Sequence, residues 1–499
     1  MSKPYCTQED FNDSELIIGL VGPVGVDFGP VIEYLQSQLS KYIYETKIIN
    51  VSETIIPMFV NIEEKQSPYE NAIEKMDKGD DARSSAGENS ILAKGVAAYI
   101  ASKREKKNQH RPRVAYIVKS LKHPKEVTRL QSIYPHGFYL IGVNSSIEKR
   151  KDFLRERKGM KPSEVDALIK LDEDGRLDSG QHTSDTFHLA DFFINLDNED
   201  TRSGSKKRIL QLLFGHPFIT PLFDEYAMFM AFTASLRSAD LSRQVGAAIA
   251  HNEELLAVGA NDCPKFEGGL YWPHLQKDGS TEDKKGGRDY TRNVDANRDE
   301  QLKIIEDICN AAKEKGVGKQ SVQKFREVLD QSRINDLMEF GRMVHAEMEA
   351  LLSCARRGVS TKSASLYSTT FPCHNCAKHI VASGIKRVVY VEPYPKSKAF
   401  DLHDDAISAD KNKKDVVIFE PFEGVSPRRF FDLFSMNLSH GRKLKRKNKQ
   451  NGNSVTWSEA NAKLRIQMLP QSYLQLEEIA AFEVNDLIQK SQITDKEEL

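Results

Sequence analysis

Five residues in the second half of the chain have the types and the spacing of a metal-dependent catalytic centre. His345 and Glu347 occur in VHAEMEALLSCARRG, and Pro372, Cys373 and Cys376 occur in PCHNC. Two cysteines at this spacing also occur in redox motifs and in half of a structural zinc site, which needs a second ligand pair. The other cysteines stand singly and supply no such pair: Cys6, Cys263, Cys309 and Cys354. The pattern therefore predicts zinc held by His345, Cys373 and Cys376, with the fourth position open to water.

An open coordination position is typical of a catalytic zinc. Zinc lowers the pKa of a bound water from about 15.7 to about 7, which makes hydroxide available near neutral pH. Glu347 lies two residues after His345, close to the metal without having to bind it. The order H-x-E, then P-C-x-x-C, is the signature of zinc deaminases. We therefore expect Glu347 to move protons while hydroxide replaces the amine of an aminopyrimidine.

The elements that must position these residues follow from the hydrophobic pattern. Apolar residues recur at helical spacing after His345, and Gly358 supplies a helix stop. Two short apolar runs flank the turn NEE, which predicts an antiparallel hairpin. The expected order is a hairpin (245–251 and 255–261), a helix (344–357), a strand (365–369), a helix (374–383) and two strands (387–392 and 415–422).

The first 200 residues alternate short apolar runs with amphipathic stretches, which predicts βαβ units and a parallel sheet. The expected strands are 15–22, 44–51, 113–120, 137–144 and 190–197. The first strand leads into GPVGVDFG, in which Gly22 and Gly25 are candidates for phosphate contacts. The loop lacks the lysine of a working P-loop, so phosphoryl transfer is not expected. A strand-turn-helix without any ligand is the alternative.

The length, composition and net charge of the chain indicate no general attraction to nucleic acid or membranes. Its 499 residues carry 71 Lys and Arg against 72 Asp and Glu. No apolar run is long enough to span a bilayer, and the N-terminus lacks a secretory pattern. We expect a cytoplasmic protein with reduced thiols. The run RKLKRKNK at 442–449 is read as a solvated or disordered segment, with an RNA-phosphate contact as the alternative.

The segment SRQVGAAIAHNEELLAVGANDCP, followed by HAE and PCHNC, resembles the cytidine deaminase superfamily, and within it the deoxycytidylate deaminases. The resemblance implies that Asn261 contacts the sugar hydroxyl and that Tyr394 lies beside the nucleotide. Arg243, Lys396 and Lys398 are candidates for phosphate contacts, with charges at the ends of elements as an equal alternative.

The chain departs from the simple family in two places. Glu349 stands where many deoxycytidylate deaminases have Asn, which leaves the phosphate state of the substrate open. The polar segment at about 262–335 is too long for an ordinary connection and is read as an insertion, helical over 295–333.

Most of the chain resembles bacterial anti-phage deoxycytidine-nucleotide deaminases, more specifically in the deaminase than in the N-terminal half. That resemblance implies an α/β architecture with two domains: a degenerate P-loop kinase-like domain over 1–212 and a three-layer α/β/α deaminase over 213–499. It also implies conversion of dCTP or dCMP to uracil nucleotides, a homo-oligomer and, in some members, inhibition by a small RNA. The alternatives are a deaminase of tRNA or single-stranded DNA and a catalytically idle nucleotide sensor. The intact Glu347 disfavours the sensor.

Overall fold

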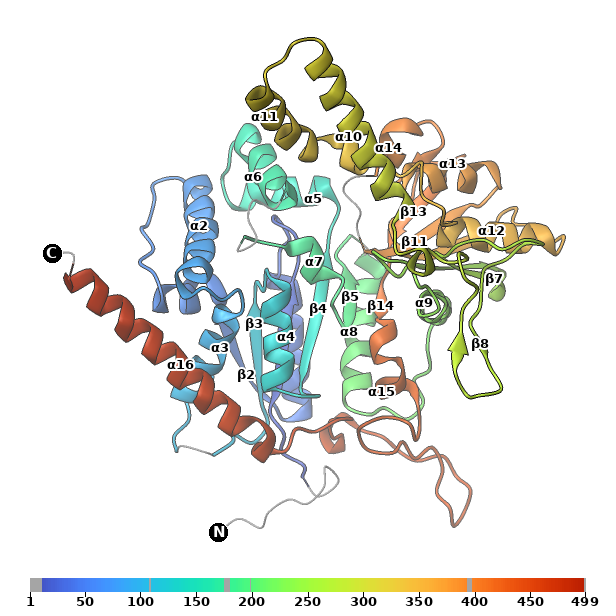
Figure 1. Cartoon of the computed structure of the whole chain (residues 1–499). Coiled ribbons are helices and arrows are strands. Elements are labelled where there is room, and N and C mark those ends of the chain that lie inside the picture. Colours follow the sequence, from blue (N-terminus) through green and yellow to red (C-terminus); the bar gives the residue numbers. More distant parts are fainter. Residues whose placement is uncertain (1–10, 107–108, 175–179, 198, 393–396, 498–499) are drawn as a thin grey trace. The chain divides into compact units, whose positions relative to one another are not determined.

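The computed structural model describes residues 11–106, 109–174, 180–197, 199–392 and 397–497 (Figure 1). The chain divides into two compact units, one made of residues 1–225 and 423–499 and the other of residues 226–422. This division differs from the predicted boundary at 212/213, because the C-terminal segment belongs to the first unit. Backbone pairing causes the difference: β14 (Gly424–Val425) adds an antiparallel strand beside β5 (Phe192–Asn195).

The first unit is built on a six-stranded sheet in the order β14-β5-β4-β1-β3-β2. All pairings except that of β14 are parallel, which confirms the predicted parallel sheet. The predicted strands are present as β1 (Leu16–Val21), β2 (Glu45–Asn50), β3 (Val114–Lys119), β4 (Phe138–Asn144) and β5.

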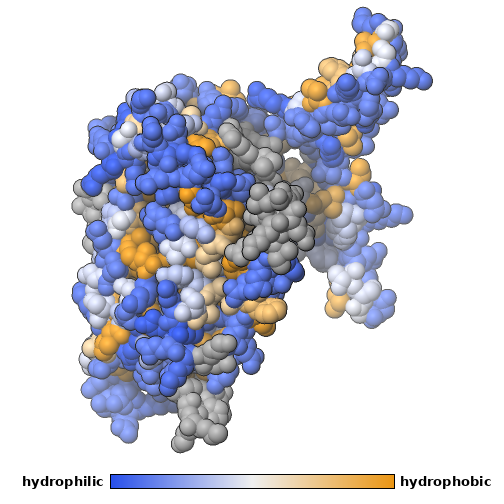
Figure 2. Space-filling view, turned by 90° about the vertical axis from the view of Figure 1, so that its left-hand side faces the viewer, coloured by the Kyte–Doolittle hydropathy of each residue, from blue (hydrophilic) through white to orange (hydrophobic). Residues whose placement is uncertain are grey.

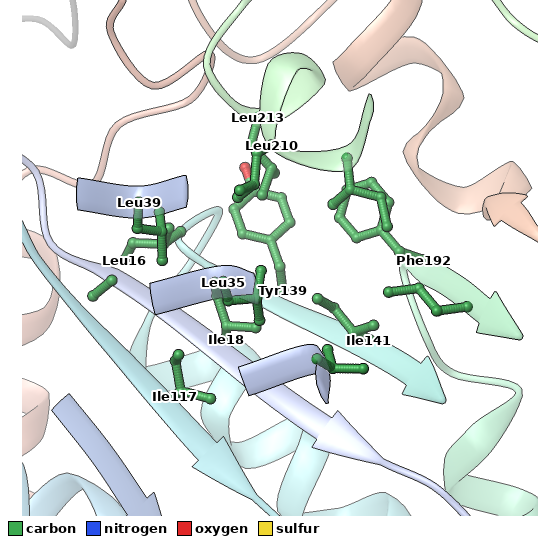
Figure 3. Packing of buried hydrophobic residues seen from close by; sticks show 14 of the residues in the cluster. Leu16, Ile18, Leu35, Leu39, Ile117, Tyr139, Ile141, Phe192, Leu210 and Leu213 are labelled. Atoms are coloured by element: carbon green, nitrogen blue, oxygen red, sulfur yellow. The ribbon is translucent and has the colours of Figure 1, made fainter. Parts of the chain in front are cut away.

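Alternate residues of this sheet pack under two helices. Leu16 and Ile18 of β1 lie in one buried cluster with Leu35 and Leu39 of α1 (Gly29–Leu39) and with Leu213 of α8 (Glu199–Leu213) (Figure 3). The residues of β1 between them are buried as well, so both faces of this strand are covered. The other helices of the unit are α2 (Pro68–Ala86), α3 (Ile91–Ser102), α4 (Pro124–Ile133), α5 (Ile147–Asp152), α6 (Pro162–Asp174), α7 (Thr183–Phe187), α15 (Phe430–Phe434) and α16 (Pro470–Glu497).

The second unit has a mixed sheet in the order β12-β13-β11-β10-β6-β7. Its hairpin is confirmed, and the two turn residues Asn252 and Glu253 both have positive φ, as a type I′ turn requires. The strands are β6 (Gly246–His251), β7 (Glu254–Ala260), β10 (Ser365–Thr370), β11 (Arg387–Glu392), β12 (Ile407–Ser408) and β13 (Val417–Pro421). β10 pairs in parallel with β11 and antiparallel with β6.

Two glycines let helices approach this sheet closely. A Cβ on Gly246 would lie 1.9 Å from the carbonyl oxygen of Ala231 in α9 (Phe223–Ser235). A Cβ on Gly259 would lie 2.1 Å from the carbonyl oxygen of Ala346 in α12 (Ala346–Arg356). Gly259 pairs with Ala247, the residue after Gly246. Because successive residues of a strand face opposite sides, the two glycines lie on opposite faces of the sheet. Helices therefore cover both faces, as the predicted three-layer arrangement requires.

The segment read as an insertion has a structure of its own within the second unit. It forms a short hairpin, β8 (His274–Leu275) with β9 (Thr281–Glu282), and the helices α10 (Ala296–Glu314) and α11 (Lys319–Asp330) (Figure 1). The predicted helical character is confirmed, whereas the hairpin was not predicted. Ile305, Cys309 and Val322 form a small separate core between the two helices.

The surface that Figure 2 shows is mostly hydrophilic, with hydrophobic residues in small scattered patches. Such patches are ordinary on a water-exposed protein surface. Among the helices described, none combines the length and the hydropathy needed to cross a membrane.

Replacing Gly259 with alanine should push α12 away from β7, because the added methyl group would meet backbone atoms that cannot turn aside. We expect the free energy of unfolding to fall by about 1–3 kcal/mol, measured by denaturant titration. Gly318→Ala is the control, since nothing lies within 4 Å of its added carbon. Equal stability of the two variants would contradict the close approach of α12.

Candidate active site

The three predicted metal ligands meet at the start of two helices. His345 is the N-cap residue of α12, one position before the helical turn in which it was expected. Cys373 is the N-cap of α13 (His374–Ala382), and its sulfur accepts the backbone N–H of Cys376 at 3.5 Å. The Nδ1 atom of His345 lies 3.4 Å from the sulfur of Cys373 and 3.4 Å from that of Cys376.

This donor set fits zinc. One imidazole nitrogen and two sulfurs all lie within 4.8 Å of one another. A tetrahedral zinc with ordinary bond lengths holds a nitrogen and a sulfur ligand about 3.6 Å apart. The two measured N–S distances are close to that value, so His345, Cys373 and Cys376 could hold the ion with small adjustments of their side chains.

The electrostatics of the cluster favour negative charge on Cys373. Hydrogen bonds from Cys376 and then His345 lower the pKa of Cys373 to about 4, although burial opposes the shift. The hydrogen bond with Cys373 raises the pKa of His345 to about 9, so the imidazole must release a proton before it binds a metal ion. The N-termini of two helices also favour negative charge at this point. Cys373 is therefore held as a thiolate, which is the form that binds metal.

Glu347 lies beside the three ligands in the first turn of α12. Its side chain is only 4% exposed. The Ser368 hydroxyl donates to Oε1 at 3.2 Å, and Oε2 lies 3.5 Å from the sulfur of Cys376. Burial, and then the negative charge of Cys373, raises the pKa of Glu347. A raised pKa suits a carboxylate that must both accept and release a proton.

Ser368 was not predicted from the sequence. It lies in β10, four residues before Pro372, where a single serine in a strand carries no recognisable signal. Only the pairing of β10 in the centre of the sheet brings its hydroxyl group to Glu347.

A cavity of about 240 Å³ opens beside the ligand cluster. Its lining includes five of the residues predicted to form the site: Arg243, Asn261, His345, Glu347 and Cys373. Thr370 and Phe371, which precede the cysteine motif, complete the wall next to Cys373. The hairpin, α12 and the end of β10 therefore contribute to one pocket.

Asn261 holds the loop that carries Arg243. Its amide oxygen accepts the backbone N–H of Val245 at 2.7 Å, and its amide nitrogen donates to the carbonyl oxygen of Arg243 at 2.8 Å. Arg243 forms an ion pair with Glu392 at the end of β11, and 45% of its side chain is exposed. Asn261 thus shapes the pocket wall, and Arg243 stands at its rim.

Of the other three candidates for nucleotide contacts, only Lys398 lies among the described residues. Tyr394 and Lys396 fall outside the residues that the structure describes. Lys398 pairs with Asp401 at 3.0 Å and is absent from the described pocket lining. Its predicted phosphate contact stays a prediction.

The insertion contributes to the pocket, which the sequence did not reveal. Asp295 and Asn297, at the start of α10, line the cavity together with Met338, Gly341 and Met343. The Asn297 side chain donates to the carbonyl oxygen of Leu337 at 2.8 Å and accepts the N–H of Phe340 at 3.3 Å. These bonds tie α10 to the chain that leads into His345.

The loop after β1 in the first unit binds a protein carboxylate. The backbone N–H of Val24, between Gly22 and Gly25, donates to Asp172 of α6 at 2.7 Å. The Lys122 ammonium group donates to the other oxygen of Asp172 at 3.3 Å and to the carbonyl oxygen of Gly22 at 3.0 Å. Gly25 has φ +87°, a conformation that favours glycine.

Cys373→Ala should remove one of the three ligands and a thiolate. We expect the purified variant to lose most of its bound metal, measured by elemental analysis per chain. Cys354→Ala is the control, because Cys354 is buried on the same helix as Glu347 but is not part of the ligand cluster. Full metal content in Cys373→Ala would contradict the proposed ligand set.

Residues 222–392 match a family model described as the cytidine and deoxycytidylate deaminase zinc-binding region. The deoxycytidylate deaminase of Enterobacteria phage T2 is 51% identical over 55 residues, which are 11% of this chain and 29% of that protein. A probable deoxycytidylate deaminase of Drosophila melanogaster is 33% identical over 106 residues, which are 19% of this chain and 51% of that protein. The matched part of this chain thus covers about half or less of the length of these relatives.

Among solved structures, the dCMP deaminase from the cyanophage S-TIM5 in complex with dCMP and dUMP is 21% identical, with a TM-score of 0.23. The similarity covers 41% of this chain and 100% of that chain. The family match includes Glu347 and the three residues whose geometry fits zinc, His345, Cys373 and Cys376. Residues 222–392 therefore match the zinc-binding region of the cytidine and deoxycytidylate deaminases.

Proposed function

We propose that this protein deaminates free deoxycytidine nucleotides, dCTP or dCMP, by zinc-dependent hydrolysis. The observation that carries the proposal is the placement of Glu347, His345 and Cys373 on the wall of one small cavity, with Cys376 next to Glu347. The same cavity is lined by Asn261, the residue that the family resemblance connects with the sugar. The deoxycytidylate deaminases among the relatives support this substrate class.

The residues of the site have separate roles in the reaction. His345, Cys373 and Cys376 would hold the zinc ion, which when bound supplies Lewis-acid activation of water near neutral pH. The carboxylate of Glu347 accepts the proton of the attacking water and delivers it to the ring nitrogen of cytosine. A C–O bond forms at the amine-bearing carbon. Glu347 then takes the second proton from the newly added hydroxyl group and gives it to the amine, which leaves as ammonia when the C–N bond breaks. The Ser368 hydroxyl holds Oε1 of that carboxylate in place.

The described lining of the cavity offers no basic, aromatic path for a polynucleotide. Arg243 is the one Lys or Arg among the described lining residues, whereas Asp240 and Asp295 are acidic. Binding of single-stranded nucleic acid needs a basic path with several aromatic side chains for stacking. Phe371 is the one aromatic residue of the described lining. This wall fits one base better than it fits a strand.

The proposal is tested by measuring ammonia release and the product formed from dCTP, dCMP, CTP, deoxycytidine and a cytosine-containing oligonucleotide. Glu347→Gln should reduce kcat by at least about 10²-fold, because it removes the proton carrier. The variant should keep its zinc, since Glu347 is not among the ligands.

Conversion of dCTP or dCMP that depends on Glu347 would support the proposal and identify the preferred phosphate state. Activity on the oligonucleotide alone would replace it with a polynucleotide editor. Zinc-loaded protein that converts none of the five would favour the nucleotide sensor.

We propose a kinase-like origin for the first unit, with a loop that no longer serves phosphoryl transfer. Its loop follows β1, which lies between β3 and β4, at the carboxyl edge where parallel sheets bind ligands. Asp172 accepts the hydrogen bond from the Val24 N–H that a phosphate oxygen in this loop would otherwise accept. Lys122 balances the negative charge of Asp172. An internal carboxylate therefore fills the anion position.

Asp172→Ala should destabilise the first unit, because it leaves Lys122 and the Val24 N–H without this partner. We expect a loss of about 3 kcal/mol in the free energy of unfolding, measured by denaturant titration. Asp166→Ala on the same helix should change it by less than about 1 kcal/mol, because Asp166 is 63% exposed. If ATP raised the Tm of the wild type but not that of Gly25→Ala, this would contradict the proposal that Asp172 fills the anion position of the loop.

Depletion of deoxycytidine nucleotides during phage infection, which the resemblance implies, stays a proposal. So do assembly into a homo-oligomer and inhibition by a small RNA. The basic run at 442–449 belongs to the first unit, where the Nε of Arg446 donates to the carbonyl oxygen of Pro217 at 2.7 Å.

A further inference from the structure

A second group of metal-binding side chains lies in the first unit, far from the deaminase ligands in the sequence. His136, Asp432 and His440 each offer one ligand atom, and these atoms all lie within 4.8 Å of one another. His136 stands in the loop between α4 and β4, Asp432 in α15, and His440 in the segment that follows α15. The family model, which covers residues 222–392, includes none of the three.

The three side chains are closely arranged. The Nδ1 atom of His440 lies 2.9 Å from Oδ1 of Asp432. The rings of His136 and His440 stack with centroids 4.9 Å apart and an interplanar angle of 23°. Asp432 is buried, whereas both imidazoles reach the surface. His136 has φ +63°, a left-handed conformation that is uncommon for a residue other than glycine.

Both carboxylate oxygens of Asp432 have partners, but its negative charge is only partly neutralised. Oδ2 lies 3.4 Å from the Nη1 atom of Arg429, and that guanidinium is paired with Asp191 at 2.8 Å. Arg465 donates to the backbone carbonyl of Asp432. Oδ1 accepts the backbone N–H of His440 at 3.3 Å and faces the ring of the same residue. The positive charge of Arg429 is therefore largely balanced by a second carboxylate.

An Asp–His hydrogen bond explains part of this arrangement. It accounts for the contact between Asp432 and His440, but it gives no reason for a second imidazole in a left-handed loop to lie against the first. Nitrogen and oxygen ligands of one tetrahedral zinc lie about 3.3 Å apart. The deaminase ligands show comparable spacing, 3.4 Å between His345 and each cysteine sulfur. Rotation of the imidazole rings, whose terminal torsion is broad, can bring the donors together.

We propose that His136, Asp432 and His440 bind a divalent transition-metal ion, of which zinc is the best match to two imidazoles and a carboxylate. The ion would join the loop before β4 to the C-terminal segment 423–499. That segment already pairs with the sheet through β14. The site would therefore be structural, and it is independent of the deaminase reaction.

Cobalt titration of the full-length protein, stripped of metal, separates the two sites. Cobalt bound by the cysteines gives a near-ultraviolet thiolate charge-transfer band, whereas cobalt bound by histidine and aspartate adds none. We expect about two equivalents of Co²⁺ per chain, of which one produces no thiolate band. His136→Gln and His440→Gln should each retain the thiolate band and lose the other equivalent. His274→Gln, which changes an exposed histidine outside both clusters, should bind as the wild type does.

A wild-type chain that binds only the thiolate-linked equivalent would overturn the proposal, whatever the variants do. So would a second equivalent that survives in both His136→Gln and His440→Gln. The wild-type Tm provides a second measure, because a ligand of the folded state raises it. Metal added beyond the thiolate-linked equivalent should raise the Tm of the wild type and of His274→Gln but not that of His136→Gln.

Discussion

The close approach of one imidazole to two thiol groups governs the second unit. His345 and the two cysteines come from different helices, and each helix begins at a ligand. The two helix ends direct their free backbone N–H groups and positive dipole ends towards the same point, which stabilises thiolate there. The sheet must therefore hold two helix starts within hydrogen-bonding distance. The glycine at 259 allows this for α12, because any side chain there would meet the helix backbone.

The cavity beside the ligands depends on the same arrangement. The hairpin supplies Asn261, whose side chain is used to hold the backbone on either side of Gln244. The insertion supplies Asp295 and Asn297 to the lining. A segment that was read only as an insertion thus becomes part of the site.

In the first unit, the loop after β1 also lies where a ligand could bind, but a side chain of the protein occupies it. This glycine loop occupies the position at which open parallel sheets bind ligands, yet an internal acid satisfies the loop amide. The pair of Lys122 and Asp172 also connects the strand edge to α6. The backbone of this loop is used here for internal packing. The C-terminal segment reinforces the same sheet by adding β14 at its edge.

The sequence alone determined the main secondary structure elements and the residues of the ligand cluster. The five parallel strands, the hairpin, the two ligand-bearing helices and the set His345, Glu347, Cys373 and Cys376 all follow from spacing and periodicity, which act over a few residues. Contacts between distant segments were decided only by the tertiary structure. Ser368 reaches Glu347, Asn297 enters the pocket, and Asp172 fills the loop after β1 because strand pairing and helix packing bring them there. The return of residues 423–499 to the first unit has the same cause, since a two-residue strand leaves no periodic signal and is formed by its partner.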